Sequence, residues 1–448
     1  MGDTKTFQIV FISICIVLTI AGVFVFSFGG TKAKKGSYTG ATAIIWGTED
    51  EKMMTDLINA SDSAGTKVYA KYVEKDAANF NQILLEALAT GRGPDAILVS
   101  AEDLLTYQDK ILTIPFETLN ERDFKDRFIE EGELFRTDKG FLAVPFSVDP
   151  LVLYWNRDIF TIHDKTSPPA NWSTIVSLVP EMRDISEDLT VFEAVISLGD
   201  YRNINNAKSI LSALMLQSGT VITSLKYQEN GEKIILNSEL DGSSRDTMVV
   251  PAVAALNFYT QFADPLSKVY SWNRSLPNSL DMFASDDLAM YIGFGSESNL
   301  IRSKNPNLNF DMALLPQSSA SAVPVTYGKM LGIAVFSSSK NQVGAYQAIS
   351  SLTAAPFIKA YAEKTGLPPV RRDLLATLPG TADGNILYKS AIYSRGFLDP
   401  NPTKTGSIFQ TMIESVLSGR LTSNNAVQGA DSQFRLLIDE FNQKQDIE

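Results

Sequence analysis

Cysteine and histidine are almost absent from this chain of 448 residues, which has one of each, Cys15 and His163. A single cysteine cannot form a disulfide within the chain, and the scarcity of both residues removes most side chains that bind zinc, copper or haem. It also leaves little material for a nucleophile paired with a histidine base. We therefore expect no metal site and no cofactor, and we interpret His163 as a surface loop residue.

Basic residues are in the minority, with 39 Lys and Arg against 51 Asp and Glu and a formal net charge of −12. Nucleic-acid binding needs a basic surface that releases counterions, so we exclude nucleic acid as a partner. The composition is otherwise ordinary, with 44% hydrophobic and 20% charged residues and no low-complexity block. A globular chain of this length is too long for one compact core, which predicts two lobes.

Long apolar runs are missing except at the amino terminus, where residues 7–28 carry no charge. At a rise of about 1.5 Å per residue, this run is long enough to cross a hydrocarbon core of about 30 Å as a helix. It is also longer than the apolar part of a typical cleaved signal. We predict an uncleaved transmembrane anchor with a flexible tether over residues 1–36. Cys15 lies inside the apolar run and is interpreted as an embedded thiol rather than a lipid attachment point.

The segment after the tether alternates between strand and helix patterns. Strands are predicted at Ala41–Trp46, Lys67–Val73 and Ala96–Val99, and helices at Glu51–Ala60 and Asn79–Thr90. Gly91 is placed to end the second helix, and Pro94 forbids its continuation. This alternation predicts an α/β fold with a parallel sheet, in which ligands bind beyond the carboxyl ends of the strands. Further helices are predicted at Ala207–Gln217 and Pro251–Phe262.

Several motifs, in their order and spacing, resemble those of the bacterial extracellular solute-binding proteins of family 1, which include the maltose-binding proteins of ABC importers. The motifs are Ile44–Thr48, Gly91–Asp95, Ala143–Phe146, Leu153–Phe160, Ala289–Gly293 and Tyr361–Pro369. The resemblance implies a two-lobed periplasmic-binding-protein-like fold with a ligand cleft between the lobes. It places chain crossings near Gly140–Phe160, Thr326–Leu331 and Thr353–Pro356. Lobe 1 would hold residues 37–148 and 331–353, and lobe 2 residues 149–330 and 354–448.

The same resemblance implies a function. The body would lie outside the cytoplasm, although the lysines that follow the apolar run favour the opposite orientation by the positive-inside rule. There a monomer would capture a small solute, expected to be a carbohydrate, by lobe closure and deliver it to an ABC permease. Two alternatives stay open: a sensory or scaffold protein of the same fold, and a glycan-acting enzyme with paired carboxylates. No catalytic motif supports the enzyme, so we expect none.

Polar candidates for ligand contacts follow the predicted strands. Thr48 and Glu49 follow the first strand, Glu102 and Asp103 follow the third, and Asp149 lies at the first crossing. By motif these residues match positions where carbohydrate-binding relatives place polar contacts. Another interpretation is that Glu49, Glu102 and Asp103 only begin helices, where acidic side chains complement the helix dipole.

Aromatic candidates are fewer. Sugar sites use aromatic rings that stack on pyranose faces, and Trp272 and Tyr327 are the rings that we expect in this role, with a core position as the alternative for Trp272. Ser296 lies in the glycine-rich turn Gly293–Glu297, where backbone can approach a ligand closely. Relatives often place a tryptophan near Ser296, and this chain has none there. Trp46 and Trp172 are predicted to be packing residues.

Overall fold

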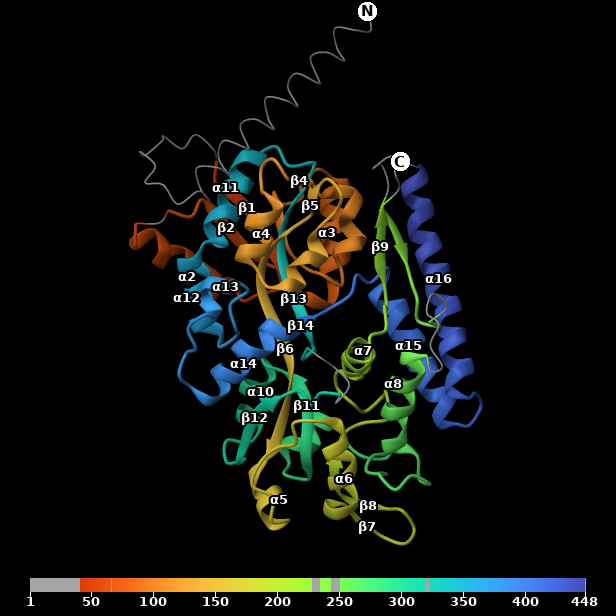
Figure 1. Cartoon of the computed structure of the whole chain (residues 1–448). Helices are drawn as coiled ribbons and strands as arrows, with labels where there is room; N and C mark the ends of the chain where they lie inside the picture. Colours follow the sequence, from red (N-terminus) through yellow and green to blue (C-terminus); the bar gives the residue numbers. More distant parts are fainter. Residues whose placement is uncertain (1–40, 66, 228–233, 243–249, 319–322, 448) are drawn as a thin grey trace, which may run out of the picture. The chain divides into compact units, whose positions relative to one another are not determined.

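The computed structural model describes residues 41–65, 67–227, 234–242, 250–318 and 323–447. Within these ranges the chain forms two compact units (Figure 1). Unit 1 holds the described residues up to Ser147 together with Met330–Thr365 and Pro369–Ala376, and unit 2 holds Val148–Lys329, Gly366–Pro368 and the residues from Thr377 onward. Neither unit is contiguous in sequence, as the resemblance implied.

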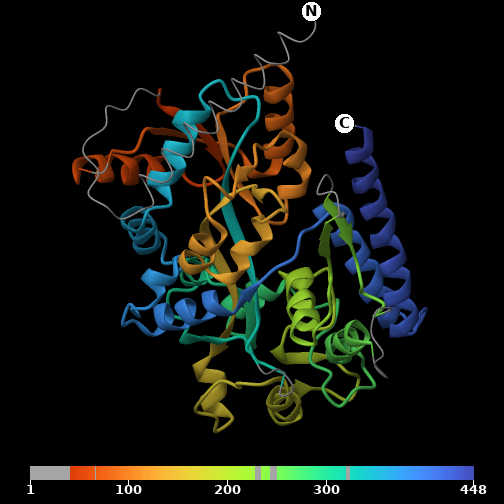
Figure 2. The same cartoon turned by 45° about the horizontal axis from the view of Figure 1, so that its top comes forward.

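A parallel sheet forms the centre of unit 1. Strand β1 (Ala43–Gly47) lies between β2 (Ala70–Glu74) and β3 (Ala96–Ser100) and is parallel to both. Residues 331–335 of β13 (Thr326–Val335) add an antiparallel strand beside β3. Figure 2 shows the same strands from a second direction. The three strands expected from sequence are therefore present, and their carboxyl ends meet at one edge of the sheet.

The crossover helices of unit 1 form for local reasons. Helix α2 (Glu51–Ser63) begins at Asp50, whose carboxylate accepts a hydrogen bond from the Met53 amide, and it buries Met54, Leu57 and Ile58. Helix α3 (Phe80–Ala89) is followed by Gly91 in a left-handed conformation with φ of 67°, the helix end that the sequence predicted. The other elements of unit 1 are η1 (Ala77–Asn79), η2 (Leu104–Lys110), β4 (Ile114–Pro115), α4 (Glu121–Arg127), η3 (Glu130–Phe135), β5 (Gly140–Phe141), α11 (Gln342–Leu352), α12 (Ala355–Thr365) and α13 (Arg372–Leu375).

The sheet of unit 2 is mixed. The part of β6 (Val144–Asn156) that lies in unit 2 pairs antiparallel with β11 (Leu288–Phe294) on one side and β12 (Phe310–Leu314) on the other. Strand β8 (Val191–Ile196) continues the sheet parallel to β11, and the short β7 (Asp184–Ile185) closes it. The end of β11 therefore lies beside the beginning of this part of β6, with Phe294 opposite Leu151.

Helices and short strands surround this sheet. They are α5 (Arg157–Ile162), α6 (Trp172–Met182), α7 (Ala207–Gln217), β9 (Ser224–Tyr227), β10 (Ile234–Asn237), α8 (Pro251–Thr260), η4 (Gln261–Ala263), α9 (Ser279–Ala284), α10 (Glu297–Lys304), α14 (Ala382–Tyr393), β14 (Ser394–Arg395), α15 (Pro402–Leu417) and α16 (Ser423–Ile447). The two helices expected from sequence in this part are present as α7 and α8. Trp172 is buried, and its indole N–H donates to Gln217 Oε1 at 2.6 Å, which confirms its packing role.

The chain passes between the units at three main places. The first two lie within β6 and β13, but the last lies after Ala376, further along the chain than the expected crossing near Thr353–Pro356. Residues 354–365 were expected in lobe 2 and instead belong to unit 1. The physical reason is that α12 buries Phe357, Ile358 and Tyr361 and packs against α2 and α11 of the same unit.

Candidate functional site

Polar side chains gather at the carboxyl edge of the unit 1 sheet. Thr48 and Glu49 follow β1 directly, Glu74 ends β2, and Glu102 and Asp103 follow β3. Thr48 and Asp103 are exposed, whereas Glu49 and Glu102 are partly buried. The parallel strands thus bring the four unit 1 residues expected from sequence to one edge.

Glu49 is held by two tyrosines that the sequence analysis did not single out. The hydroxyl of Tyr361, on α12, donates to Glu49 Oε2 at 2.9 Å, and the Glu49 amide donates to the Tyr72 hydroxyl at 2.8 Å. Burial raises the pKa of the Glu49 carboxyl, and the bond from Tyr361 partly offsets that rise. Tyr361 is itself 2% exposed and packs edge-on against Phe146, with ring centroids 4.7 Å apart. Glu49 is therefore a partly desolvated acceptor in a fixed position.

The acidic residues that follow β3 are engaged in a local turn. Ser100 Oγ donates to Asp103 Oδ2 at 2.7 Å, and the Asp103 amide donates back to Ser100 Oγ at 3.0 Å. Asp103 immediately precedes η2, so its position also fits the interpretation that it only begins a helix. Across the sheet, the Glu51 amide donates to Glu74 Oε2 and the Glu74 amide to Glu51 Oε2, each at 3.0 Å. This edge of unit 1 is rich in carboxylate acceptors.

In unit 2 the structure brings together two residues that the sequence named separately. The Ser296 amide, after β11, donates at 3.1 Å to Oδ1 of Asp149, which lies within β6. Burial raises the pKa of Asp149 to about 6, while the bonds from Ser296 and the charge of Lys329 act in the opposite direction. The antiparallel pairing of β6 with β11 explains this meeting of residues that are 147 positions apart.

A second polar group lies next to this pair in unit 2. Glu297 Oε2 accepts a hydrogen bond from the Tyr291 hydroxyl at 2.5 Å, and Glu297 Oε1 accepts one from Asn206 Nδ2 at 2.8 Å. A Cβ atom on Gly293 would lie 2.3 Å from Glu297 Oε2, so glycine is required to let the carboxylate sit there. The sequence analysis missed both partners of Glu297. Asn206 is 91 positions away in sequence, and Tyr291 lies inside the apolar pattern of β11.

The structure contradicts the expected stacking role of Trp272. Its side chain is 0% exposed in the hydrophobic core of unit 2, and its indole N–H donates to Asn203 Oδ1 at 3.0 Å. Both ring faces are covered by protein, so the core alternative is correct. Tyr327 is 1% exposed and packs near Phe397, with ring centroids 6.2 Å apart, which likewise leaves no ring face for a sugar. Trp46, expected to pack, is partly exposed, with Lys75 Nζ 4.2 Å from its ring centroid.

The remaining candidates lie away from these clusters. His163 ends α5 with its Nε2 atom 3.6 Å from Glu193 Oε1 and its side chain partly exposed. Among the residues that the structure describes, no group of three or more His, Cys, Asp or Glu side chains could hold a metal ion.

The anchor expected at residues 7–28 lies outside the described residues. Within the described ranges, no helix has both the length and the apolar character needed to cross a membrane.

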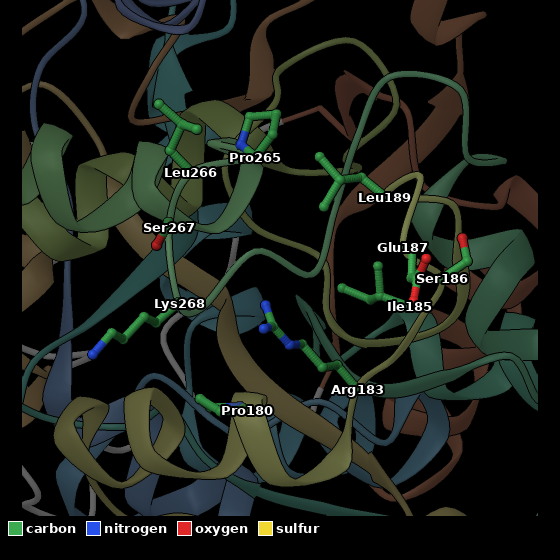
Figure 3. A pocket seen from close by; sticks show the side chains of 10 residues that line it. All are labelled: Pro180, Arg183, Ile185, Ser186, Glu187, Leu189, Pro265, Leu266, Ser267 and Lys268. Carbon is green, nitrogen blue, oxygen red and sulfur yellow. The ribbon is translucent and has the colours of Figure 1, made fainter.

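A groove of about 430 Å³ lies at the other end of the unit 2 sheet, beside the turn between β7 and β8 (Figure 3). Arg183, Glu187 and Lys268 lie in its wall together with apolar side chains such as Leu189 and Leu266. The groove contains none of the residues expected to contact a ligand. It is next to the start of β8, whereas Asp149 and Ser296 lie beside the end of β11, which runs parallel to β8.

Comparison with known proteins identifies the family. Residues 58–387 match the family model described as bacterial extracellular solute-binding protein. The chain belongs to this family. A protein of Brucella abortus (strain 2308), named as a binding protein, is 20% identical over 307 residues, which are 65% of this chain and 67% of the relative. The family assignment agrees with the resemblance of the sequence motifs, and its described members are binding proteins rather than enzymes.

Solved structures of solute-binding proteins share the fold. The sugar-binding protein MalE from Xanthomonas citri has a TM-score of 0.70 and 15% identity, and the likeness covers 91% of this chain and 100% of MalE. UgpB from Mycobacterium tuberculosis, solved in complex with glycerophosphocholine, has a TM-score of 0.67 and 15% identity, with 90% and 99% of the two chains covered. These likenesses establish a periplasmic-binding-protein-like α/β fold for this solute-binding protein.

Proposed function

We propose that this solute-binding protein captures a small carbohydrate outside the cytoplasm and delivers it to an ABC permease. The observation that carries the proposal is a pair of fixed, partly desolvated carboxylates, each beside the end of a strand: Glu49 follows β1 in unit 1, and Asp149 lies beside the end of β11 in unit 2. Carboxylate oxygens accept hydrogen bonds from sugar hydroxyls, and desolvated carboxylates make such bonds strong. The family and the fold shared with the sugar-binding protein MalE support the same function.

The proposed contacts are residues with polar groups at the two strand-end clusters: Thr48, Glu49, Glu102, Asp103, Asp149 and Ser296. Glu297 joins them as a seventh, because its carboxylate lies beside Asp149 and is fixed by Tyr291 and Asn206. Capture by lobe closure belongs to the same proposal. With carboxylates prevailing in both clusters, a neutral polyhydroxylated solute is favoured over an anionic one such as a sugar phosphate.

We also propose that residues 7–28 anchor the protein in the membrane and that the body is a monomer. The uncharged length of this run in the sequence supports the anchor. Full-length protein should stay with membranes during alkaline extraction, whereas protein that lacks residues 1–36 should be released. Release of the full-length protein would contradict the anchor and leave the solute-binding proposal untouched.

A solute panel tests the main proposal. Purified full-length protein would be screened by thermal shift against neutral mono- and oligosaccharides, polyols, amino sugars and sugar phosphates, and hits measured by calorimetry. We expect a neutral sugar to raise the melting temperature and sugar phosphates to have no effect. Strongest binding by a sugar phosphate would contradict the predicted chemistry.

Variants then locate the site. Glu49→Gln and Asp149→Asn should each weaken binding of the identified sugar by about tenfold or more, since each removes a charged acceptor worth roughly 1.5–3 kcal/mol. The matched controls are Glu117→Gln in unit 1 and Asp287→Asn in unit 2, both exposed carboxylates. The affinity of each control variant for the sugar should stay within about twofold of the affinity of the original protein. Equal losses in variants and controls would show that the strand-end carboxylates are not the contacts.

A further inference from the structure

Unit 2 contains a second hollow whose chemistry differs from that of the carboxylate clusters. It has a volume of about 320 Å³ and lies where α14 meets β12 and the loop that precedes α6. Its walls include Pro168 and Pro169 from the loop, Leu314 from β12, and Ile386 and Tyr393 from α14. Ligand pockets in proteins span about 300–1,000 Å³, so this one suits a small molecule.

The spacing along α14 explains why this helix forms a wall. Ile386, Ser390 and Tyr393 are four and then three residues apart, so they share one face of the helix. That face packs toward β12, the strand with which α14 is in contact. The pocket is thus framed by regular secondary structure on two sides and by a rigid proline pair on a third.

Ser390 is the unusual member of this wall. Its side chain is 1% exposed, and its hydroxyl has no hydrogen-bond partner among the residues that the structure describes. A buried hydroxyl without a partner costs free energy, and most buried polar groups in folded proteins are paired. A hydroxyl held in this state at the wall of a pocket points to a partner supplied by a bound molecule.

Two other polar side chains at the pocket, Gln317 and Thr326, are already engaged. Gln317 Nε2 donates to the carbonyl oxygens of Leu315 and Val325, and Gln317 Oε1 accepts from the Val325 amide. Thr326 Oγ1 donates to the Leu151 carbonyl at 2.7 Å. Among the described residues that line the pocket, none carries a charged side chain. A charged molecule would lose its hydration without compensation there.

We propose that this pocket is a second ligand site, which takes a small uncharged molecule with a compact hydrocarbon body and one hydroxyl group, as in a phenol. The hydrocarbon body lies against the prolines, Leu314 and Ile386, and the hydroxyl bonds to Ser390 Oγ. The site is independent of the proposed sugar contacts, which offer charged acceptors for several hydroxyls.

Phenol and toluene are the probes, because they differ only in a hydroxyl against a methyl group. Binding to the full-length protein would be titrated by ligand-observed NMR, with benzoate as a charged third probe. We expect phenol to saturate in the millimolar range or below, toluene to bind more weakly, and benzoate not to bind. Absence of saturable phenol binding up to about 10 mM, or benzoate binding as tightly as phenol, would overturn the proposal.

Three substitutions locate the probe. Ser390→Ala should weaken phenol binding about five- to tenfold and leave toluene binding within about twofold. It should not lower the melting temperature, because no protein partner is lost and a buried unpaired hydroxyl is removed. Ile386→Trp, with Ala313→Val as a milder alternative, should fill the pocket and weaken both probes at least tenfold. Ser407→Ala, in an exposed part of α15, is the matched control and should change nothing. Equal weakening of phenol and toluene by Ser390→Ala, or unchanged binding in both filled variants, would overturn the assignment.

Discussion

Each unit holds a partly buried carboxylate beside the end of a strand, but the two units fix that carboxylate in different ways. In unit 1, Glu49 depends on a side chain from a distant helix, the hydroxyl of Tyr361, 312 residues away in sequence. In unit 2, Asp149 is bonded by a single nearby residue, Ser296 after the neighbouring strand, through both its side chain and its backbone amide. Burial raises the pKa of both carboxyl groups.

This difference predicts which substitutions should disturb each carboxylate. The unit 1 cluster should respond to single side-chain changes, because one hydroxyl supplies the hydrogen bond. The unit 2 cluster should respond to changes in backbone packing, because a Cβ on Gly295 would lie 2.4 Å from Leu387 Cδ2 and 3.3 Å from Asp149 Oδ1.

The largest effect should come from the core of unit 2. Trp272→Ala removes a fully buried indole and its bond to Asn203, which should cost about 3–5 kcal/mol of the free energy of unfolding of unit 2. Hydrogen exchange measured by mass spectrometry should show faster exchange throughout unit 2 and unchanged exchange in β1, β2 and β3.

Trp46→Ala is the comparison for this substitution. Trp46 is partly exposed in unit 1, so its loss should cost about 1–2 kcal/mol, mainly the apolar contact and the interaction with Lys75. If Trp272→Ala destabilised the protein no more than Trp46→Ala, the core position of Trp272 would be wrong and a ligand-stacking role would return.

The next largest effect is the response of unit 2 to pH. The folded pKa of Asp149 is raised from 3.8 to about 6, so the folded protein holds this proton more tightly than the unfolded chain does. Its contribution to stability is fully present below pH 3.8 and is lost as the pH rises through about 6. At roughly 1.4 kcal/mol per pKa unit, the change is at most about 3 kcal/mol.

Chemical denaturation of the full-length protein at pH 7 and pH 5 measures this response. The unit 2 transition should be more stable at pH 5, and Asp149→Asn should remove that gain. Both pH values lie above 4.5 so that Glu414 does not contribute to the difference. The pKa of Glu414 is lowered to about 2, chiefly by its bond from Arg202, so the stability that it contributes is lost only in more acidic solution. If Asp149→Asn gained as much stability between pH 7 and pH 5 as the original protein, the pH response would belong to another group.

Much of the fold could be predicted from sequence because its signals are local. The alternating strand and helix patterns, the helix stop at Gly91 and the apolar run Ala96–Val99 each act within a short stretch of chain. Together they predict β1, β2 and β3 and the edge at which polar residues meet. For the same reason Thr48 and Glu49 could be named as candidates. The position of the third crossing could not, because α12 joins unit 1 through packing that its own pattern does not specify.

The aromatic candidates failed for a physical reason. Trp272 follows polar residues and precedes an arginine and a proline, which suggested an exposed segment. In the structure the Ser271 and Trp272 amides donate to the Phe262 carbonyl, and Ser271 Oγ accepts from the Val195 and Ile196 amides of β8. These long-range bonds carry the segment into the core. The same limitation hid Tyr361, whose partner Glu49 can be found only once α12 is placed.

An effect as small as that of Trp46→Ala should come from Tyr361→Phe, which sharpens the contrast between the two carboxylates. The substitution keeps the ring against Phe146 but removes the hydroxyl that donates to Glu49 Oε2. Because that bond lowers the pKa of Glu49, its loss should raise this pKa further and cost about 1–2 kcal/mol at pH 7. The deficit should shrink toward pH 4, where protonation removes the poorly solvated charge.

Tyr107→Phe is the control. It loses a bond to the neutral Asn81 amide and should show the same deficit at both pH values. Denaturation of both variants at pH 7 and pH 4 measures the difference, and a pH-independent deficit in Tyr361→Phe would mean that Glu49 does not depend on this hydroxyl for its charge.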